Sequence, residues 1–162
     1  MALKAAIGSQ SGVRLKVVGG HLGLHNVPMT TRFIKLNDGW NADPNVPDER
    51  LDLHVYELVL SFRLNRFQFA AAEGERAAIR FSDVSHYRLG EENDHAWYEG
   101  LGRYPEAPVW GEFYEVREGV PPLDEGGWVE VHNPRAPRHF LFYLRDSTFE
   151  CLAVDWKLER QF

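Results

Sequence analysis

Three features are scarce in this sequence: cysteine, long apolar runs and clustered basic charge. The single cysteine, Cys151, excludes an internal disulfide and favours a reducing, cytoplasmic location. No apolar run approaches the roughly 18 residues that cross a bilayer. The N-terminal sequence MALKAAIGSQSG lacks the charged and apolar regions of a signal peptide. We therefore expect a soluble cytoplasmic protein that does not bind a membrane.

The motifs that usually identify nucleotide-binding proteins and hydrolases are also absent. The glycines do not have the spacing of a phosphate-binding loop with its Lys and Ser/Thr, and no G-x-S-x-G sequence occurs. A formal net charge of -6 without a basic stripe disfavours nucleic acid as a partner. We predict no cofactor, the catalytic residues stay unknown, and binding is favoured over catalysis.

The composition is that of a packed globular protein. Among 162 residues, 44% are hydrophobic and 13% are aromatic, too many for a disordered chain. A chain of this length buries roughly 70% of its unfolded surface in one core. We expect a single β-rich domain over residues 1–162, with residues 1–11 flexible.

Alternating apolar residues predict strands rather than helices. In LDLHVYELVLSFRLN, residues 51–65, the apolar positions switch parity near Tyr56 and Glu57. A β-bulge or a break between two strands would produce that switch. A helix is the competing interpretation, but no sustained i, i+3, i+4 stripe supports it.

Several other segments have a strand-like pattern. The predicted strands are VRLKVV (13–18), VWGEFYEV (109–116), WVEVH (128–132) and HFLFYLR (139–145), with a return strand containing Cys151. A hairpin is predicted over FQFAAAEGERAAIRF (67–81), a reversal at 146–148 and one short helix at DVSHYRL (83–89). The predicted fold class is mainly β, an antiparallel β-sandwich or partly open barrel with at most one or two short helices. Cys151 is expected to be a small core residue.

The loop NDGWNADPN, residues 37–45, raises the question of whether it binds a ligand or only turns the chain. Asn41, Asp43 and Asn45 alternate oxygen-bearing side chains, as a calcium loop does, but the glycine and glutamate of that motif are missing. Asp43 before Pro44 is typical of a turn. Trp40 is then expected to cover the edge of the core, and a ligand-lining role for Trp40 and Asn41 stays open.

The histidines and paired acids form no convincing metal or catalytic motif. In HLGLH the flanking glycines argue against a helix, and in a strand His21 and His25 would lie about 13 Å apart. Asp94 and His95 are adjacent, and adjacent side chains seldom orient one another as an acid and base. We predict no metal site.

Acidic and aromatic residues concentrate in one quarter of the chain. Residues 91–130 hold eleven Asp or Glu against two Arg, a local charge of -9, whereas the rest carries thirteen acids and sixteen bases, +3. The same segment contains seven large aromatic residues: Trp97, Tyr98, Tyr104, Trp110, Phe113, Tyr114 and Trp128. Either these aromatics fill the core while the acids face solvent, or the two together form a recognition surface.

The main functional hypothesis is a binding protein whose acidic, aromatic-rich loops at 93–110 bind a basic protein or a cationic ligand. The alternative is a carbohydrate-binding module or carbohydrate-active enzyme in which aromatic side chains stack on sugar rings; a third hypothesis is metal-dependent hydrolysis through His95. A small polar ligand or a homodimer through an exposed sheet edge is also compatible with the sequence. The candidate ligand- or partner-binding residues are Trp40, Asn41, Asn93, Asp94, His95, Trp97, Tyr98, Tyr104, Trp110 and Glu112.

Overall fold

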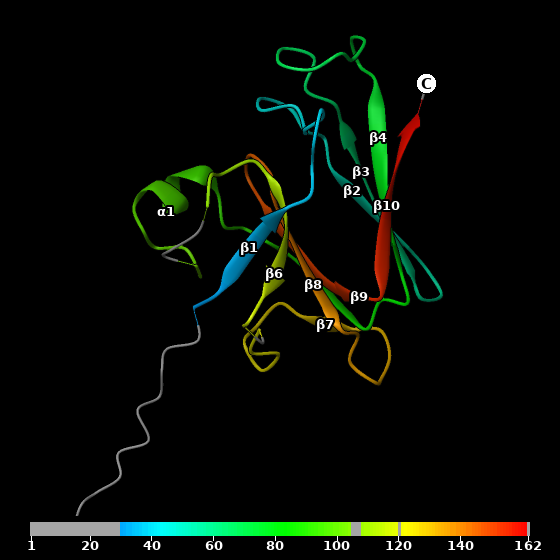
Figure 1. Ribbon diagram of the computed structural model, residues 1–162, viewed down its shortest axis with the longest axis vertical. Helices are drawn as coiled ribbons and strands as arrows, with labels where there is room; N and C mark the ends of the chain where they lie inside the picture. The colour runs from blue at the N-terminus through cyan, green and yellow to red at the C-terminus, as the bar shows by residue number, and fades with distance from the viewer. Residues whose placement is uncertain (1–29, 105–107, 120, 162) are drawn as a thin grey trace, which may run out of the picture.

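The computed structural model describes residues 30–104, 108–119 and 121–161, which form a sandwich of two antiparallel sheets (Figure 1). The first sheet contains, in spatial order, β1 (Arg32–Lys35), β6 (Phe113–Arg117), β8 (Arg138–Tyr143), β9 (Thr148–Ala153), β5 (His86–Gly90) and β7 (Val129–Glu130). The second contains β10 (Asp155–Gln161), β4 (Arg76–Ser82), β3 (Glu57–Arg63) and β2 (Arg50–His54). The predicted fold class is thus confirmed as mainly β. The predicted strand at 13–18, the pair His21 and His25 and the N-terminal segment lie outside the described residues.

The chain crosses between the two sheets at sharp corners. Only Val154 separates β9 in the six-stranded sheet from β10 in the four-stranded sheet, and its N–H donates to the Ser82 carbonyl at 2.9 Å. The parity switch seen in the sequence is a break between strands. Val55 and Tyr56 form the turn between β2 and β3, with Val55 at a φ of 57°.

The main core lies between the sheets and is rich in phenylalanine. Alternate residues of β3 and β4 point inward, as the period-2 pattern predicts, and meet the inner face of β6, β8 and β9. The fully buried phenylalanines of this core are Phe62, Phe81, Phe113, Phe140, Phe142 and Phe149. Trp40 is only 7% exposed and stacks on Phe62 with ring centroids 5.8 Å apart, so its expected place at the core is confirmed.

The outer face of the six-stranded sheet is covered as well. A second apolar cluster there contains the buried residues Tyr114, Val116, Leu141 and Tyr143, against which Phe33, Trp97, Tyr104 and Trp110 pack. Helix α1 (Asp94–Tyr98) lies on this outer side, away from the four-stranded sheet (Figure 1). Part of the aromatic content of residues 91–130 therefore serves a second core.

Two predictions of secondary structure were wrong, the hairpin at 67–81 and the helix at 83–89. Residues 67–74 contain no strand, so the predicted hairpin reduces to β4, which pairs with β3 and β10. The segment predicted as a helix contains β5, because His86 and Arg88 point to a sheet face that other residues cover. The one helix among the described residues begins after Asn93, whose side-chain oxygen accepts the Ala96 N–H at 3.0 Å.

The reversal between β8 and β9 and the burial of Cys151 are confirmed. Leu144 N–H donates to the Ser147 carbonyl at 2.9 Å and closes the turn. Cys151 is fully buried in the main core, and burial raises the pKa of its thiol well above the ordinary value. A thiol in this position is a packing residue. No helix within the described ranges has the length and apolar character needed to cross a membrane.

Removing the Phe142 ring should test the sandwich core. Phe142 is fully buried and contacts the Trp40, Phe62 and Phe113 rings at centroid distances of 6.1, 5.3 and 5.5 Å. Phe142→Ala should lower the free energy of unfolding by about 3–5 kcal/mol, measured by urea denaturation. The matched control is Phe67→Ala, because Phe67 is 63% exposed; its effect should stay within about 0.5 kcal/mol. Equal losses in the two variants would contradict this assignment of the core.

Candidate functional site

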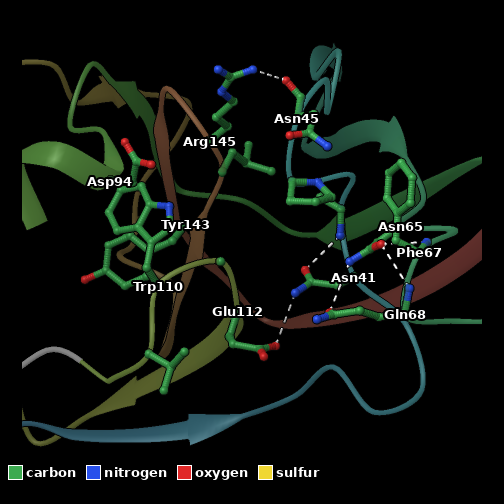
Figure 2. A pocket seen from close by; sticks show the side chains of 15 residues that line it. Asn41, Asn45, Asn65, Phe67, Gln68, Asp94, Trp110, Glu112, Tyr143 and Arg145 are labelled. Carbon is green, nitrogen blue, oxygen red and sulfur yellow. Dashed lines mark hydrogen bonds between the residues drawn. The ribbon is translucent and has the colours of Figure 1, made fainter. Parts of the chain in front are cut away.

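A cleft of about 460 Å³ opens beside the turn between β8 and β9, and it brings together five segments distant in sequence (Figure 2). We call it the amide cleft because amide side chains are its most frequent polar lining. Its lining residues are Asn41, Ala42, Pro44, Asn45, Asn65, Phe67, Gln68, Asp94, Val109, Trp110, Gly111, Glu112, Tyr143, Leu144 and Arg145.

One wall of the amide cleft is aromatic and belongs to the six-stranded sheet. The Trp110 ring stacks on Tyr143 of β8, with centroids 4.4 Å apart and planes at 29°. Trp97 of α1 packs beside Trp110 at 6.3 Å. Figure 2 shows Trp110, Tyr143 and Asp94 together on one side of the cleft. The second apolar cluster thus holds this wall in place.

The opposite wall carries amides and lies at the end of the four-stranded sheet (Figure 2). Asn65 follows β3, and its side-chain oxygen accepts the N–H groups of Phe67 and Gln68 at 3.0 and 3.3 Å. Its side-chain nitrogen donates to the Gln68 side-chain oxygen at 3.2 Å. Asn41 stands beside it, because the Asn65 N–H donates to the Asn41 carbonyl at 2.8 Å. These bonds fix the amides next to one another.

The loop at residues 37–45 therefore both turns the chain and lines the cleft. Asp43 Oδ1 accepts the N–H groups of Asn45 and Val46 at 2.8 and 3.0 Å, which confirms the predicted turn. Asn37 is 2% exposed and joins the two walls. Its amide donates to the Trp40 carbonyl at 3.0 Å, and its oxygen accepts the Phe113 N–H at 3.0 Å.

Charged groups stand at two ends of the cleft, and most are neutralised. Glu112 accepts hydrogen bonds from the Asn37 and Asn41 amides at 2.5 and 3.5 Å and pairs with Lys35 at 3.2 Å. The Arg145 guanidinium donates to the Asn45 carbonyl and lies 3.8 Å from the Asp146 carboxylate. Among the described residues, Asp94 has no ion-pair partner, so its carboxylate is the free charge of the cleft.

The aromatic wall rests on a buried charged cluster centred on Glu150. This residue of β9 is 2% exposed and bonds to four side chains from other segments. The contacts are Arg88 Nε at 2.9 Å, His139 Nε2 at 2.8 Å, Arg103 Nη1 at 3.1 Å and the Tyr104 hydroxyl at 3.2 Å. Because a buried carboxylate is costly without partners, these bonds hold residues 103–104 against the sheet.

Glu92 is a second carboxyl beneath this segment. Its Oε1 is buried without a hydrogen-bond partner among the described residues, and a Cβ at Gly102 would come within 2.3 Å of it. Burial raises the pKa of Glu92, and the negative charge of Glu150 adds to the shift, against a hydrogen bond from the Arg103 N–H. Glu92 thus retains its proton to higher pH in the folded protein.

Four of the ten predicted site residues line the amide cleft: Asn41, Asp94, Trp110 and Glu112. The other six lie elsewhere. Trp40 belongs to the main core, Asn93 caps α1, and Trp97 and Tyr104 pack in the second cluster. His95 and Tyr98 are exposed on α1, with Tyr98 stacked edge-on against Trp97 at 4.8 Å.

Sequence reasoning missed the amide wall and Arg145. Asn65, Phe67 and Gln68 fall in a segment that the sequence placed across a strand end and a hairpin, and Arg145 lay at the end of a predicted strand. The available signal was the adjacent polar pair Asn65 and Arg66 in LNRFQF. Such a pair after an apolar strand indicates a turn, but it does not show which part of the protein the turn faces.

Four of the eleven acids at residues 91–130 form ion pairs with arginine or lysine in the part of the chain that the structure describes. The ion pairs are Glu112–Lys35, Glu115–Arg138, Glu118–Arg32 and Glu125–Arg103, at 2.9–3.6 Å. Glu115 of β6 accepts a hydrogen bond from Arg138, whereas Glu112 lines the cleft. The two carboxylates therefore do not face a common site, as a pair of catalytic carboxyls would have to. The free acidic charge is therefore smaller than the sequence count of -9.

Neither metal-binding geometry nor a known relative assigns a function. Within the described ranges, no three His, Cys, Asp or Glu side chains come together in a way that could hold a metal ion. Comparisons with models of known protein families, with curated proteins and with solved structures find no match for this chain.

The raised pKa of Glu92 should make stability depend on pH. The carboxyl has an ordinary pKa of 4.5 when unfolded and a higher one when folded, so the folded state binds the proton more tightly. This contribution is full below pH 4.5 and is lost as pH rises through the folded pKa. The free energy of unfolding of the wild-type protein should therefore fall relative to that of Glu92→Gln between about pH 4 and pH 7, a range that begins near the ordinary carboxyl pKa. Urea unfolding of both proteins across this range measures the difference. Parallel curves, or the same divergence in Glu99→Gln on the surface, would contradict it.

Proposed function

We propose that this chain is a binding protein whose amide cleft takes a neutral, hydroxyl-rich ligand of the oligosaccharide class. The observation that carries the proposal is the lining of the cleft, with a tryptophan on one wall and several amides on the other. A cytoplasmic location belongs to the same proposal and is supported by the single, buried Cys151.

The chemistry of the two walls suits a sugar ring. A pyranose has an apolar face that packs against an aromatic ring and hydroxyls that both donate and accept hydrogen bonds. Amides match those hydroxyls because each carries a donor nitrogen and an acceptor oxygen. Glu112 is paired with Lys35 and Arg145 with Asp146, so the Asp94 carboxylate is the charge that remains, which disfavours a strongly anionic ligand in the amide cleft itself.

The walls are also fixed before any ligand arrives. Trp110 is stacked on Tyr143, and Asn41 and Asn65 are tied by backbone and side-chain bonds. Polar groups that are already oriented lose little conformational entropy on binding. A preformed cleft of a few hundred Å³ with a few convergent polar groups is a typical ligand site.

Binding should be tested by calorimetry and tryptophan fluorescence against a panel of neutral oligosaccharides. Asn41→Ala should weaken the affinity at least about tenfold for any sugar that binds, since a buried polar group left without a partner costs about 1–3 kcal/mol. Trp110→Ala should have an effect of the same size, because it removes the aromatic wall. Tyr98→Ala should leave the affinity unchanged, because Tyr98 is 74% exposed on α1 and does not line the cleft.

A silent panel would overturn the proposal. So would a sugar whose affinity responds to Tyr98→Ala and not to Asn41→Ala, because that result places the sugar on the α1 surface. Circular dichroism of each variant separates loss of binding from loss of fold.

A second proposal is that the surface around α1 binds a basic protein. Three large apolar side chains are exposed there, Tyr98 at 74%, Leu101 at 79% and Val109 at 67%, and Glu91 and Glu99 are exposed beside them. Exposed apolar area surrounded by acids fits a partner with an apolar patch and a basic rim.

Charge reversal tests this second proposal. Affinity capture from the cell lysate should retain a basic protein at low salt and lose it at high salt, because exposed charges are screened. Glu91→Lys combined with Glu99→Lys should abolish that capture. The matched control combines Asp38→Lys and Asp52→Lys, which reverses two exposed acids elsewhere and should retain the partner. Equal capture by both double variants would remove the charge argument.

A further inference from the structure

A second chamber continues from the amide cleft, and its charge is opposite in sign. The two share Asn45 and Phe67, and the second has a volume of about 510 Å³. Four arginines line it, Arg50, Arg63, Arg66 and Arg76, so we call it the arginine chamber. The arginines come from β2, β3, β4 and the turn after β3.

Three of these guanidinium groups converge on one carboxylate oxygen. Asp48 Oδ2 lies 2.7 Å from Arg76 Nη1, 3.3 Å from Arg50 Nη2 and 3.7 Å from Arg63 Nε. Arg76 also donates to the Asp48 carbonyl at 2.8 Å, which makes it the structural partner. Arg50 and Arg63 have side chains that are 67% and 45% exposed, so their remaining donors face solvent.

The other acids of the chamber do not cancel this excess. Glu73 pairs with Arg66 at 3.2 Å. Asp43 uses one oxygen, Oδ1, to accept the N–H groups of its turn. The lining therefore holds four arginines against three carboxylates, Asp43, Asp48 and Glu73, so the chamber retains a formal charge of +1 and unused N–H donors on Arg50 and Arg63.

We propose that the arginine chamber binds an anionic group carried by the same oligosaccharide that occupies the amide cleft, with Arg50 and Arg63 as its direct partners. This inference rests on the proposed function of the cleft. It keeps the neutral, hydroxyl-rich sugars in the amide cleft, between Trp110 and Asn41, and adds to the same chain a charged end that passes Phe67.

The shared rim supports one continuous ligand rather than two separate ones. Phe67 is 63% exposed between the two chambers, and the Arg66 guanidinium stands over its ring at 5.3 Å. An exposed aromatic ring at such a junction gives a sugar ring a second apolar contact. Arginine suits the charged end, because its planar guanidinium can bond both oxygens of a carboxylate or sulfate.

The decisive measurement compares charged and neutral forms of the same sugar chain by calorimetry at low salt. One pair is a neutral oligosaccharide that carries a single terminal uronic acid and the methyl ester of that acid, and the other is the same kind of oligosaccharide with a single terminal sulfate and its unsulfated parent. For at least one pair, the charged form should bind at least about tenfold more tightly than its neutral form. The pair that shows the preference identifies carboxylate or sulfate as the anion.

Two double variants locate the charge effect. Arg50→Gln with Arg63→Gln should reduce the preference to below about twofold and leave the affinity for the neutral form unchanged, because neutral sugars have no ion-pair energy to lose. Arg32→Gln with Arg117→Gln is the matched control. These side chains are 62% and 54% exposed in the six-stranded sheet, and their removal should retain the preference.

The failures of the two proposals are distinguishable. Equal affinity for charged and neutral forms, with binding still sensitive to Asn41→Ala, would overturn the arginine-chamber proposal and leave the amide cleft as a neutral-sugar site. If Asn41→Ala and Trp110→Ala leave the affinity for the charged form unchanged, the proposal that the amide cleft binds the sugar is overturned as well. Loss of the preference in both double variants would show a nonspecific charge effect and overturn the assignment to Arg50 and Arg63.

Discussion

The buried carboxylate of Glu150 is the interaction on which the candidate site depends. A charge 2% exposed on the outer face of a sheet requires partners, and this protein supplies two arginines, a histidine and a tyrosine. Two of the partners, Arg103 and Tyr104, come from the segment that follows α1. Satisfying Glu150 therefore brings that segment down over the sheet, where Trp97 packs beside Trp110.

The amide cleft lies where the two sheets meet at one end of the sandwich. Trp110 and Tyr143 belong to the six-stranded side, while Asn65 and Gln68 follow a strand of the four-stranded sheet. Asn37 holds the two sides together through the Trp40 carbonyl, the Phe113 N–H and the Glu112 carboxylate. The spacing of the walls thus depends on one buried amide that does not itself line the cleft.

The sequence predicted the sandwich because its inward residues alternate, as in β3 and β4. Such strands can be predicted from the local alternation of apolar residues, without knowledge of their neighbours in the fold. It failed for β5, where His86 and Arg88 resemble a solvent-facing pattern although both are buried. Arg88 is covered by Trp128, whose ring lies 4.5 Å from its guanidinium, and it shares Glu150 with Arg103 and Tyr104, whereas His86 contacts Ser85 and Glu130. For the same reason the amide wall was missed: Asn41 and Asn65 are adjacent only through a long-range backbone bond that no local period reveals.

The division of charge acquires a physical meaning in the folded protein. The sequence shows an acidic quarter and a basic remainder, and folding pairs several of those acids with arginines and a lysine, including Glu112 with Lys35. Near the cleft, what remains is Asp94 at the aromatic wall, the exposed Glu91 and Glu99 beside α1, and the arginines around Asp48 beyond Phe67. The net charge of the chain therefore describes neither the amide cleft nor the arginine chamber, because the charge of each depends on which groups remain unpaired after folding. A ligand long enough to cross Phe67 would meet aromatic and amide groups at one end and arginines at the other. Its two ends would therefore be distinguished, and its direction across the amide cleft and the arginine chamber would be fixed.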